Sequence, residues 1–241
     1  MARIEGAVAF ITGGNRGLGR HLVTQLVERG ARTVYAGSRD PGAVVVGPGI
    51  VPVRLDITDP EQVRAAAEQA GDTTILINNA GSSTGTSLLT GDLGQVRLEI
   101  ETHYIGTLLV TRAFAPVLAR APGGGALANV LSALSWLTFP RSGAYAAAKS
   151  AEWSLTNALR LELADQGTTV TGLHVGFMDT DMIRGLDVPK VDPAGVAAQL
   201  LDGIEAGTPE VLADDTSRAV QAGLAGGVGA LYPQFTQPAT V

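Results

Sequence analysis

Short apolar runs rich in β-branched residues alternate along the chain with longer segments in which apolar residues recur at helical spacing. The apolar runs cover 7–12, 33–37, 51–56, 74–79, 126–131 and 169–175, and the helical segments cover 17–29, 60–70, 92–120, 144–165 and 193–206. Strands that alternate with helices are typical of βαβ units. The pattern predicts an α/β fold with a doubly wound parallel sheet and helices on both faces, in three layers.

Local residue choices refine these boundaries. Asp59 is a predicted helix N-cap, with Pro60 in the first turn and Gly71 after the helix. Stretches that contain glycine or proline predict loops at 41–49, 81–91, 121–125 and 223–229. Because the 241 residues contain neither a repeat nor a linker, we expect residues 1–241 to form a single domain.

Composition narrows the classes of function. The 17 Lys and Arg residues against 23 Asp and Glu residues give a net charge of −6, which argues against a nucleic-acid partner. The absence of cysteine excludes disulfides, thiolate metal sites and a cysteine nucleophile, and we expect no metal at the site. No apolar stretch reaches the roughly 18 residues of a membrane span and no secretory signal is recognisable, so we expect a cytoplasmic protein without a membrane partner.

Gly13, Gly17 and Gly19 lie in the stretch ITGGNRGLGR, between the first predicted strand and the helix that follows it. At such a junction, glycines allow a sharp turn and the close approach of a pyrophosphate, which the free N–H groups of the helix N-terminus can bind. The spacing Gly-x-x-x-Gly-x-Gly differs from the commoner Gly-x-Gly-x-x-Gly pattern. The turn favours a dinucleotide cofactor, although any tight strand-to-helix turn can also use glycine.

Arg39 follows the second predicted strand, where NAD-binding proteins usually place an acidic residue for the ribose 2′-hydroxyl. With Arg16 of the glycine turn it would suit a 2′-phosphate, so NADP(H) is favoured over NAD(H). The alternative is that Arg39 is merely solvated and Asp40 binds the ribose. Asp40 precedes Pro41, however, and is better explained as the start of a turn.

Tyr145 and Lys149 lie four residues apart in a helical segment and therefore on one helix face. A phenol with its usual pKa of about 10 exchanges protons poorly at pH 7 unless a nearby cation stabilises the phenolate. Lys149, one of two lysines in the chain, can do this and also bind a ribose. We expect it, with an oxidised nicotinamide, to lower the pKa of Tyr145; a surface Tyr–Lys pair without function is the alternative.

Ser132 follows the predicted strand 126–131, and residues 78–81 (Asn-Asn-Ala-Gly) end another strand at the same sheet edge. The carboxyl ends of parallel strands are where open α/β sheets bind ligands. A serine hydroxyl there could hydrogen-bond the carbonyl oxygen that Tyr145 protonates, while an amide and a tight glycine turn could line the cofactor.

In order and spacing, these residues resemble the motifs of the short-chain dehydrogenase/reductase family. The matching motifs are TGGNRGLG at 12–19, Asp56 beside the adenine, NNAG at 78–81, Ser132, and the pair Tyr145 and Lys149. TGGNRGLG with SRDP is similar to NADPH-dependent carbonyl reductases of the family. The resemblance covers nearly the whole chain and implies a Rossmann-type fold, hydride transfer from C4 of a nicotinamide, and a homodimer or homotetramer formed through helices near 100–120 and 144–165.

The expected site residues combine the turn chemistry with this resemblance. The expected catalytic residues are Ser132, Tyr145, Lys149 and His103. The expected cofactor contacts are Gly13, Asn15, Arg16, Gly17, Leu18, Gly19, Ser38, Arg39, Asp56, Ile57, Asn79, Ala80, Gly81, Tyr145, Lys149, Gly176, Met178 and Thr180.

Two positions depart from the family pattern. His103 replaces an asparagine that holds a water in the proton relay behind the lysine. A histidine can also hold a water, but its charge would change at about pH 6–7; a packed histidine without a role is the alternative. Val175 replaces a proline after the sixth strand, while Gly176 and Thr180 are retained, and we still expect the nicotinamide carboxamide there, before a lid at about 180–195.

We therefore expect an NADPH-dependent reductase of a ketone or aldehyde, with Tyr145 as the proton donor. Five apolar residues suggest an apolar substrate but could equally belong to the core or to an interface: Leu134, Trp136, Phe139, Phe177 and Met182. The alternatives are imine reduction or alcohol oxidation at the same site, or a non-catalytic NADP(H)-binding sensor or scaffold.

Overall fold

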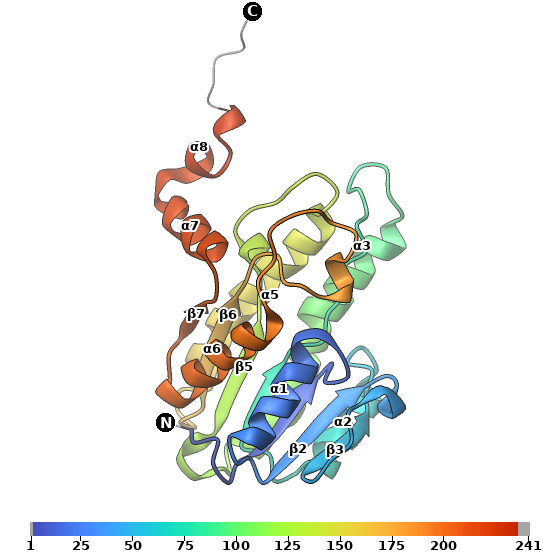
Figure 1. The fold of residues 1–241 in the computed structure, drawn as a ribbon, viewed down its shortest axis with the longest axis vertical. Coiled ribbons are helices and arrows are strands. Elements are labelled where there is room, and N and C mark those ends of the chain that lie inside the picture. The colour runs from blue at the N-terminus through green and yellow to red at the C-terminus, as the bar shows by residue number, and fades with distance from the viewer. Residues whose placement is uncertain (1, 236–241) are drawn as a thin grey trace, which may run out of the picture.

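The computed structural model describes residues 2–235 and contains one sheet of seven parallel strands in the order β3-β2-β1-β4-β5-β6-β7 (Figure 1). The strands are β1 (Val8–Thr12), β2 (Thr33–Ser38), β3 (Ile50–Arg54), β4 (Ile75–Asn78), β5 (Ala126–Val130), β6 (Thr169–His174) and β7 (Glu210–Leu212). The six predicted strands are confirmed, each to within two residues at either end. Residues 1 and 236–241 of the domain expected over 1–241 lie outside the described residues.

The sequence does not predict β7. This strand has only three residues, all half-buried, and pairs with β6 at the edge of the sheet. A run this short shows no periodicity that would separate it from a loop.

Helices cover both faces of the sheet and complete three layers, as predicted (Figure 1). On one face, α1 (Gly17–Glu28) and α6 (Pro193–Ala206) pack on a core that contains Ile11 of β1. On the other face, α2 (Pro60–Gln69), α4 (Thr107–Leu118) and α5 (Gly143–Glu162) pack on a core that contains Phe10. Neighbouring residues of β1 thus enter opposite cores because side chains alternate along a strand.

The predicted N-cap of α2 is confirmed. The Asp59 carboxylate accepts hydrogen bonds from the backbone N–H groups of Glu61 and Gln62, at 3.0 and 3.2 Å, and Pro60 occupies the first turn. Short 3-10 turns occur between the main elements: η1 (Pro41–Ala43), η3 (Pro122–Gly124), η4 (Ala133–Ser135), η5 (Asp181–Ile183) and η7 (Pro233–Phe235).

Two predicted segments are wrong. The single helix predicted over 92–120 is divided into α3 (Leu93–Ile100), the π-helical turn η2 (Glu101–Gly106) and α4. The loop predicted over 223–229 is mostly helical, since α7 (Asp215–Gly223) is followed by η6 (Leu224–Gly226) and α8 (Gly227–Leu231). Apolar spacing does not reveal a change of hydrogen-bond pattern inside a helix, and π-helical turns frequently lie at functional sites; this one contains His103.

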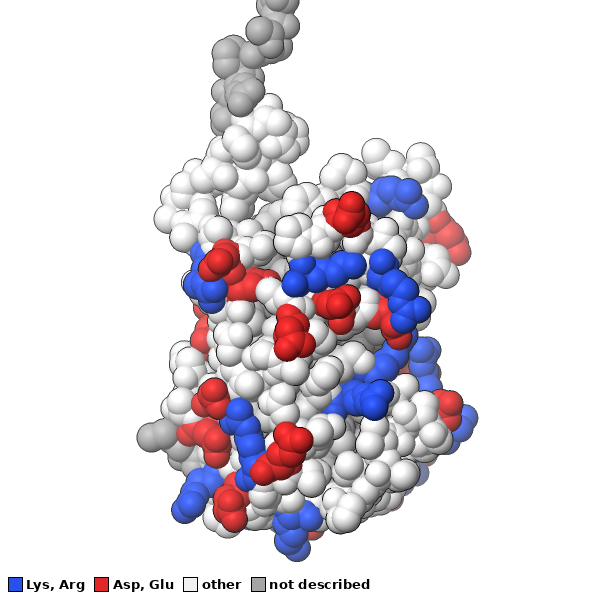
Figure 2. All heavy atoms as spheres, in the orientation of Figure 1, with Lys and Arg blue, Asp and Glu red and all other residues white. Residues whose placement is uncertain are grey.

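The topology predicts where a ligand would bind. β2 and β3 are added in turn on one side of β1, and β4 then pairs with the other side of β1. The strand order therefore reverses direction between β1 and β4. Ligands of such sheets bind beyond the carboxyl ends of the strands, at this change of direction. Basic and acidic side chains are interspersed on the face shown in Figure 2. Within residues 2–235, no helix has the length and apolar character that crossing a bilayer requires.

Candidate active site

The glycine turn after β1 leaves no room for side chains. A Cβ atom added at Gly19 would lie 2.0 Å from the carbonyl oxygen of Gly13, and one added at Gly13 would lie 3.0 Å from the Cα atom of Ala80. Gly13 and Gly17 also have positive φ angles, 68° and 49°, which residues with a Cβ atom rarely adopt. Glycine is therefore required here, and it leaves the backbone open to close approach.

Residues at the end of β4 hold this turn in place. The backbone N–H groups of Asn79 and Ala80 donate to Oγ1 of Thr12, at 2.9 and 3.0 Å. The Asn79 side-chain nitrogen donates to the carbonyl oxygens of Thr12 and Gly13, at 2.9 and 3.1 Å. The Asn79 side chain therefore fixes the backbone of the glycine turn. This role is separate from any contact that Asn79 makes with a ligand.

The N-terminus of α1 is suited to an anion. Arg16 is the N-cap residue, but its side chain forms no capping hydrogen bond with the first turn of the helix. Arg16 and Arg39 are both exposed, and neither forms an ion pair within the described chain. Uncapped helix N–H groups with free guanidinium groups beside them fit the phosphates of a dinucleotide.

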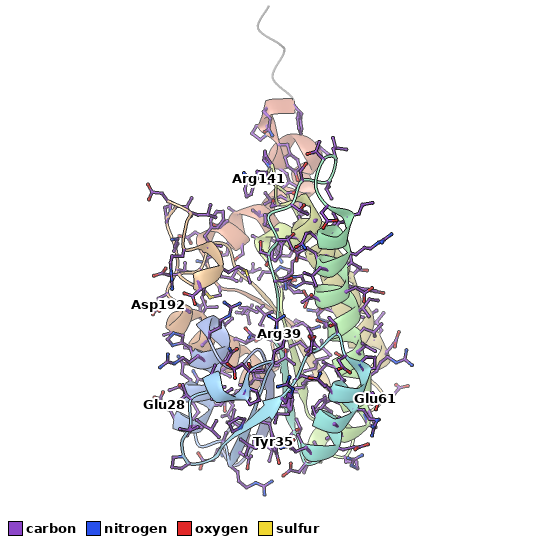
Figure 3. All side chains as sticks on the ribbon, turned by 90° about the vertical axis from the view of Figure 1, so that its right-hand side faces the viewer. Glu28, Tyr35, Arg39, Glu61, Arg141 and Asp192 are labelled. Carbon is purple, nitrogen blue, oxygen red and sulfur yellow. The ribbon has the colours of Figure 1, made fainter. Side chains whose placement is uncertain are left out.

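Arg39 lies at the end of β2 and Tyr35 nearer its start (Figure 3). The Ser38 side chain is buried, and its hydroxyl oxygen accepts a hydrogen bond from the N–H of Asp40 at 3.2 Å. The Asp40 carboxylate accepts one from the N–H of Gly42 at 3.1 Å and caps η1. The predicted role of Asp40 as a turn starter is confirmed.

The other expected cofactor contacts approach the same edge. After β6, the N–H of Gly176 donates to Oδ2 of Asp214 at 2.7 Å, and Met178 forms a β-bridge with Val191, so the segment expected as a lid is anchored at both ends. A Cβ atom added at Gly17 would lie 3.3 Å from Cγ2 of Thr180, which places Thr180 beside the glycine turn.

Four of the expected contacts are held by packing or by local hydrogen bonds. The Asp56 carboxylate accepts from the N–H and the hydroxyl of Thr58, at 3.0 and 2.8 Å. Ile57 and Leu18 are buried in the two cores, and Asn15 is half-buried within the glycine turn.

Ser132, Tyr145 and Lys149 meet at this edge of the sheet. Ser132 follows β5, and its hydroxyl oxygen accepts a hydrogen bond from the N–H of Leu134 at 3.1 Å. Tyr145 is the third residue of α5, and the Lys149 ammonium lies 5.9 Å from the centre of its ring. The ammonium also donates to the carbonyl oxygen of Val130 at 2.7 Å.

His103 connects this group to the glycine turn. Its ring lies edge-on to the Tyr145 ring, with centroids 5.2 Å apart. A Cβ atom added at Gly81 would lie 2.7 Å from Cε1 of the same histidine. Because Gly81 directly follows the residues that hold the glycine turn, these contacts place His103 and the Tyr145 ring close to that turn.

Burial and neighbouring charges set the protonation states of Tyr145 and Lys149. Burial raises the pKa of Tyr145 above its usual value of 10.0, and Glu152 raises it further, while Lys149 and a hydrogen bond with Ser132 lower it by less in total. In the protein alone the phenol therefore keeps its proton at neutral pH, and the lowering expected with an oxidised nicotinamide bound stays a prediction. For Lys149, burial favours the neutral amine, but Glu152 and Tyr145 outweigh it and raise the pKa, so the side chain stays an ammonium.

Two buried carboxylates behind Lys149 are absent from the predicted site. Glu152 accepts a hydrogen bond from Lys149 at 2.6 Å, and Glu99 lies 3.3 Å from His103. Each spacing, three residues from Lys149 to Glu152 and four from Glu99 to His103, places the pair on one helix face. That spacing is the only sequence signal, and it is weak because glutamates on helices are mostly exposed.

The predicted apolar residues separate into two groups. The Trp136 ring stacks on the buried His174 ring with centroids 3.8 Å apart and meets Trp153 edge-on at 6.0 Å, so Trp136 packs toward the interior. Phe139 and Met182 are 49% and 44% exposed and lie in the segments that follow β5 and β6.

His174 predicts a loss of stability in acid. Burial lowers its pKa from 6.5 to about 4, so the folded protein binds this proton less readily than the unfolded chain does. Stability therefore falls as the pH drops from 6.5 to 4, by up to about 3 kcal/mol from this residue. Urea unfolding at several pH values tests this: His174→Gln should flatten the pH dependence and His21→Gln should not. Equal slopes for wild type and His174→Gln would contradict the prediction.

Comparisons with known proteins agree with this geometry. The short chain dehydrogenase family model matches residues 7–189. The chain is 31% identical over 201 residues to short chain dehydrogenase tazN of Aspergillus terreus, a match that covers 77% of this chain and 44% of that protein. It is 28% identical over 218 residues to the 3-oxoacyl-(acyl-carrier-protein) reductase FabG of Salmonella typhimurium, covering 86% and 87% of the two chains.

Two solved structures extend the comparison. A short chain dehydrogenase from Burkholderia cenocepacia in complex with NADP is 40% identical, with a TM-score of 0.93 over 98% of this chain and 100% of that chain. A 3-ketoacyl-(acyl-carrier-protein) reductase from Brucella melitensis complexed with NADH is 25% identical, with a TM-score of 0.80 over 87% and 96%. The family match extends over most of the chain and includes the glycine turn, Ser132, Tyr145 and Lys149. The protein is therefore a member of the short-chain dehydrogenase/reductase family.

Proposed function

We propose that the protein is a cytoplasmic NADPH-dependent reductase that converts a ketone or aldehyde to an alcohol, with residues 1–241 as a single NADP(H)-binding domain. The observation that carries the proposal is the meeting of Ser132, Tyr145 and Lys149 beside the glycine turn. The complex of the Burkholderia cenocepacia relative with NADP supports the choice of cofactor.

Tyr145, Ser132 and Lys149 would each have a separate role in the reduction. When bound, NADPH supplies a hydride to the carbonyl carbon. Tyr145 gives its phenolic proton to the carbonyl oxygen, a role for which its raised pKa keeps it protonated. Ser132 donates a hydrogen bond that orients the same oxygen. Lys149, kept charged by Glu152, stabilises the phenolate that remains.

The cofactor would lie along the carboxyl ends of the strands. The N–H groups at the start of α1 and the bare glycine turn would hold its pyrophosphate. Arg16 and Arg39 would bind the 2′-phosphate, and Asp56 and Ile57 would lie beside the adenine. The nicotinamide half would face residues 79–81 and 176–180.

The exposed apolar residues around this edge favour an apolar substrate. Six large apolar residues in the segments that follow β4, β5 and β6 are exposed: Leu88, Leu89, Leu93, Phe139, Met182 and Leu186. Leu89 is 96% exposed, and Leu88 packs so closely on the start of α5 that a Cβ atom at Gly143 would lie 2.6 Å from its Cδ1 atom. Large apolar side chains gathered at a ligand-binding edge provide contact area for an apolar ligand.

The experiment that tests the proposal follows NADPH absorbance at 340 nm with a panel of ketones, aldehydes and imines. We expect oxidation of NADPH with at least one carbonyl compound. Turnover of imines alone would replace carbonyl reduction with imine reduction, and binding of NADPH without turnover of any substrate would indicate a sensor or scaffold.

His103 is expected to act in the proton relay. His103→Asn restores the side chain that the family places there, and an asparagine does not titrate. We expect kcat of the variant to fall, because an asparagine can hold a water but has no imidazole ring to carry a proton. The rate of NADPH oxidation at 340 nm measures this, and a variant with the same kcat as the wild type would exclude a role in the relay.

We also propose that the protein forms a homodimer or homotetramer through α4 and α5. The outer face of these helices carries a hollow of about 450 Å³, lined by residues that include Tyr104, Leu108, Leu155 and Ala158. Ala158→Glu places a charge there at an exposed position. Light scattering is expected to show a fall to the monomer mass of 24.7 kDa, while Ala65→Glu on α2 leaves the assembly unchanged. A wild type that is already monomeric would contradict the proposal.

A further inference from the structure

A row of buried charged groups leads away from Lys149. The Lys149 ammonium donates to Oε2 of Glu152 at 2.6 Å, and the same oxygen lies 3.7 Å from Nδ1 of His103. On the other side of the imidazole ring, Nε2 lies 3.3 Å from Oε2 of Glu99. Lys149, Glu152, His103 and Glu99 are each no more than 5% exposed. The row crosses from α5 through η2 to α3 without passing through bulk solvent.

The far end of the row reaches the surface at the loop after β4. The Ser82 hydroxyl donates to Oε2 of Glu99 at 3.0 Å, and the N–H of Thr84 donates to the other oxygen of this carboxylate. Ser82 is half-buried, and Ser83 beside it is exposed. The Ser82 carbonyl oxygen also lies 2.8 Å from Nε2 of His103. Water at this loop can therefore exchange protons with the outer end of the row.

His103 is the central member because both of its ring nitrogens face a carboxylate. Nδ1 is buried and has no hydrogen-bond partner among the described residues, although leaving a buried polar atom unpaired is costly. A ring movement of about 0.5 Å would bring Nδ1 within hydrogen-bond distance of Glu152. An imidazole placed between two carboxylates can receive a proton at one nitrogen and release one from the other.

We propose that Glu99, His103 and Glu152 form a proton-conducting row that recharges Lys149, and through it Tyr145, from the 82–84 loop. This inference rests on the proposed reduction, in which Tyr145 loses one proton to the product in each turnover. The Lys149 ammonium returns a proton to the phenolate and becomes an amine. The Glu152 carboxylate takes a proton from Nδ1 of His103 and passes it to this amine, while Nε2 of His103 takes up a proton from water at the Glu99 and Ser82 end. The ring is left as the Nε2–H tautomer and must return to the Nδ1–H tautomer before the next turnover.

Glu152 and Glu99 are positioning residues in this scheme, because they act on Tyr145 only through Lys149 and His103. The charged and titratable groups that face His103 are Tyr145 and Glu152 on α5 and Glu99 on α3. Thr107 donates to the second oxygen of Glu152 at 3.2 Å, which fixes this carboxylate in place. A substitution must therefore keep the size of the side chain and remove its ability to carry a proton, although an amide in place of the carboxylate also removes a negative charge.

Glu152→Gln meets this requirement, and kinetics can separate proton supply from hydride transfer. The first turnover uses the proton already on Tyr145, so we expect its rate to stay within about threefold of wild type. Steady-state kcat should fall at least about tenfold, with a larger solvent isotope effect, because reprotonation becomes limiting. The control is Glu28→Gln on α1, an exposed glutamate far from the Arg141 loop that precedes Tyr145 (Figure 3). An equal fall in both rates, or no fall in either, would overturn the proposal.

A second measurement needs neither substrate nor turnover. The chain has only three histidines, so the imidazole nitrogens of His103 can be assigned by NMR with a His103→Asn reference. Glu152→Gln and Glu99→Gln should each shift the imidazole nitrogen signals of His103, since each removes a negative charge that faces the ring. The Glu28→Gln control should leave these signals unchanged.

The two measurements keep this proposal separate from the proposed function. If wild type reduces no carbonyl compound, the proposed function fails, and the NMR signals still decide whether the row is coupled. If wild type is active and the His103 signals respond to neither substitution, the row is not coupled and the proton-conducting proposal fails alone.

Discussion

Tyr145→Phe is expected to lower kcat for carbonyl reduction by at least about a hundredfold, in the range that general-acid catalysis contributes. Phenylalanine keeps the ring and its edge-on contact with His103, but it has no proton to give. Binding of NADPH should remain measurable, because the glycine turn and Lys149 are unaltered. Turnover at 340 nm and a fluorescence titration with NADPH measure the two effects separately.

Tyr35→Phe is the matched control for this substitution. Tyr35 lies on β2, away from Tyr145, and its hydroxyl donates to Asp72 at 3.4 Å (Figure 3). The same loss of one hydroxyl should therefore leave the rate unchanged there. A Tyr145→Phe enzyme that retains most of its activity would contradict the assignment of Tyr145 as the proton donor.

Arg39→Ala is expected to raise the KM for NADPH about tenfold to a hundredfold, which corresponds to the loss of one or more charge-assisted hydrogen bonds. The KM for NADH should change little, since NADH has no 2′-phosphate for the guanidinium to bind. The side chain is exposed and forms no ion pair within residues 2–235, so its removal leaves no buried charge unpaired. Measurement of kcat/KM with both cofactors gives the change in preference.

Arg32→Ala provides the control from the same strand. Arg32 immediately precedes β2 and pairs with Asp72 at 3.0 Å, whereas Arg39 immediately follows the strand at the ligand-binding edge. Arg32→Ala removes one exposed arginine at the amino end of β2, far from the ligand-binding edge. We therefore expect it to leave the preference for NADPH over NADH unchanged. An unchanged NADPH preference in Arg39→Ala would refute binding of the 2′-phosphate by this residue.

Local sequence patterns predicted most of the fold because they reflect local physics. Alternation of apolar runs with helical segments gave six of the seven strands of the described sheet, and the Asp59–Pro60 pair marked the start of α2. The glycine turn was predictable for two reasons. Gly13 and Gly17 have positive φ angles, which glycine adopts most readily, and a Cβ atom added at Gly19 would lie 2.0 Å from a carbonyl oxygen. β7, α7 and α8 were missed because short elements at the edge of the fold carry little periodicity.

The candidate site also contains residues that the sequence predicts and residues that it does not. Ser132, Tyr145 and Lys149 were predicted from residue type, spacing and the family resemblance, and the fold brought them together. Glu99 and Glu152 were not identified, because an isolated glutamate in a helical segment gives no sign of burial. The π-helical turn that places His103 between them also leaves no mark in the apolar spacing.

By itself, the sequence determined the parallel sheet with its two helical layers, the glycine turn and the chemical groups proposed for the site. Those properties depend on residue type and on neighbours a few positions away. Only the tertiary structure decided the charge state of the site: burial and Glu152 raise the pKa of Tyr145 although Lys149 lies beside it. Burial and charge pairing depend on groups from α3, η2 and α5 that meet only when the chain is folded.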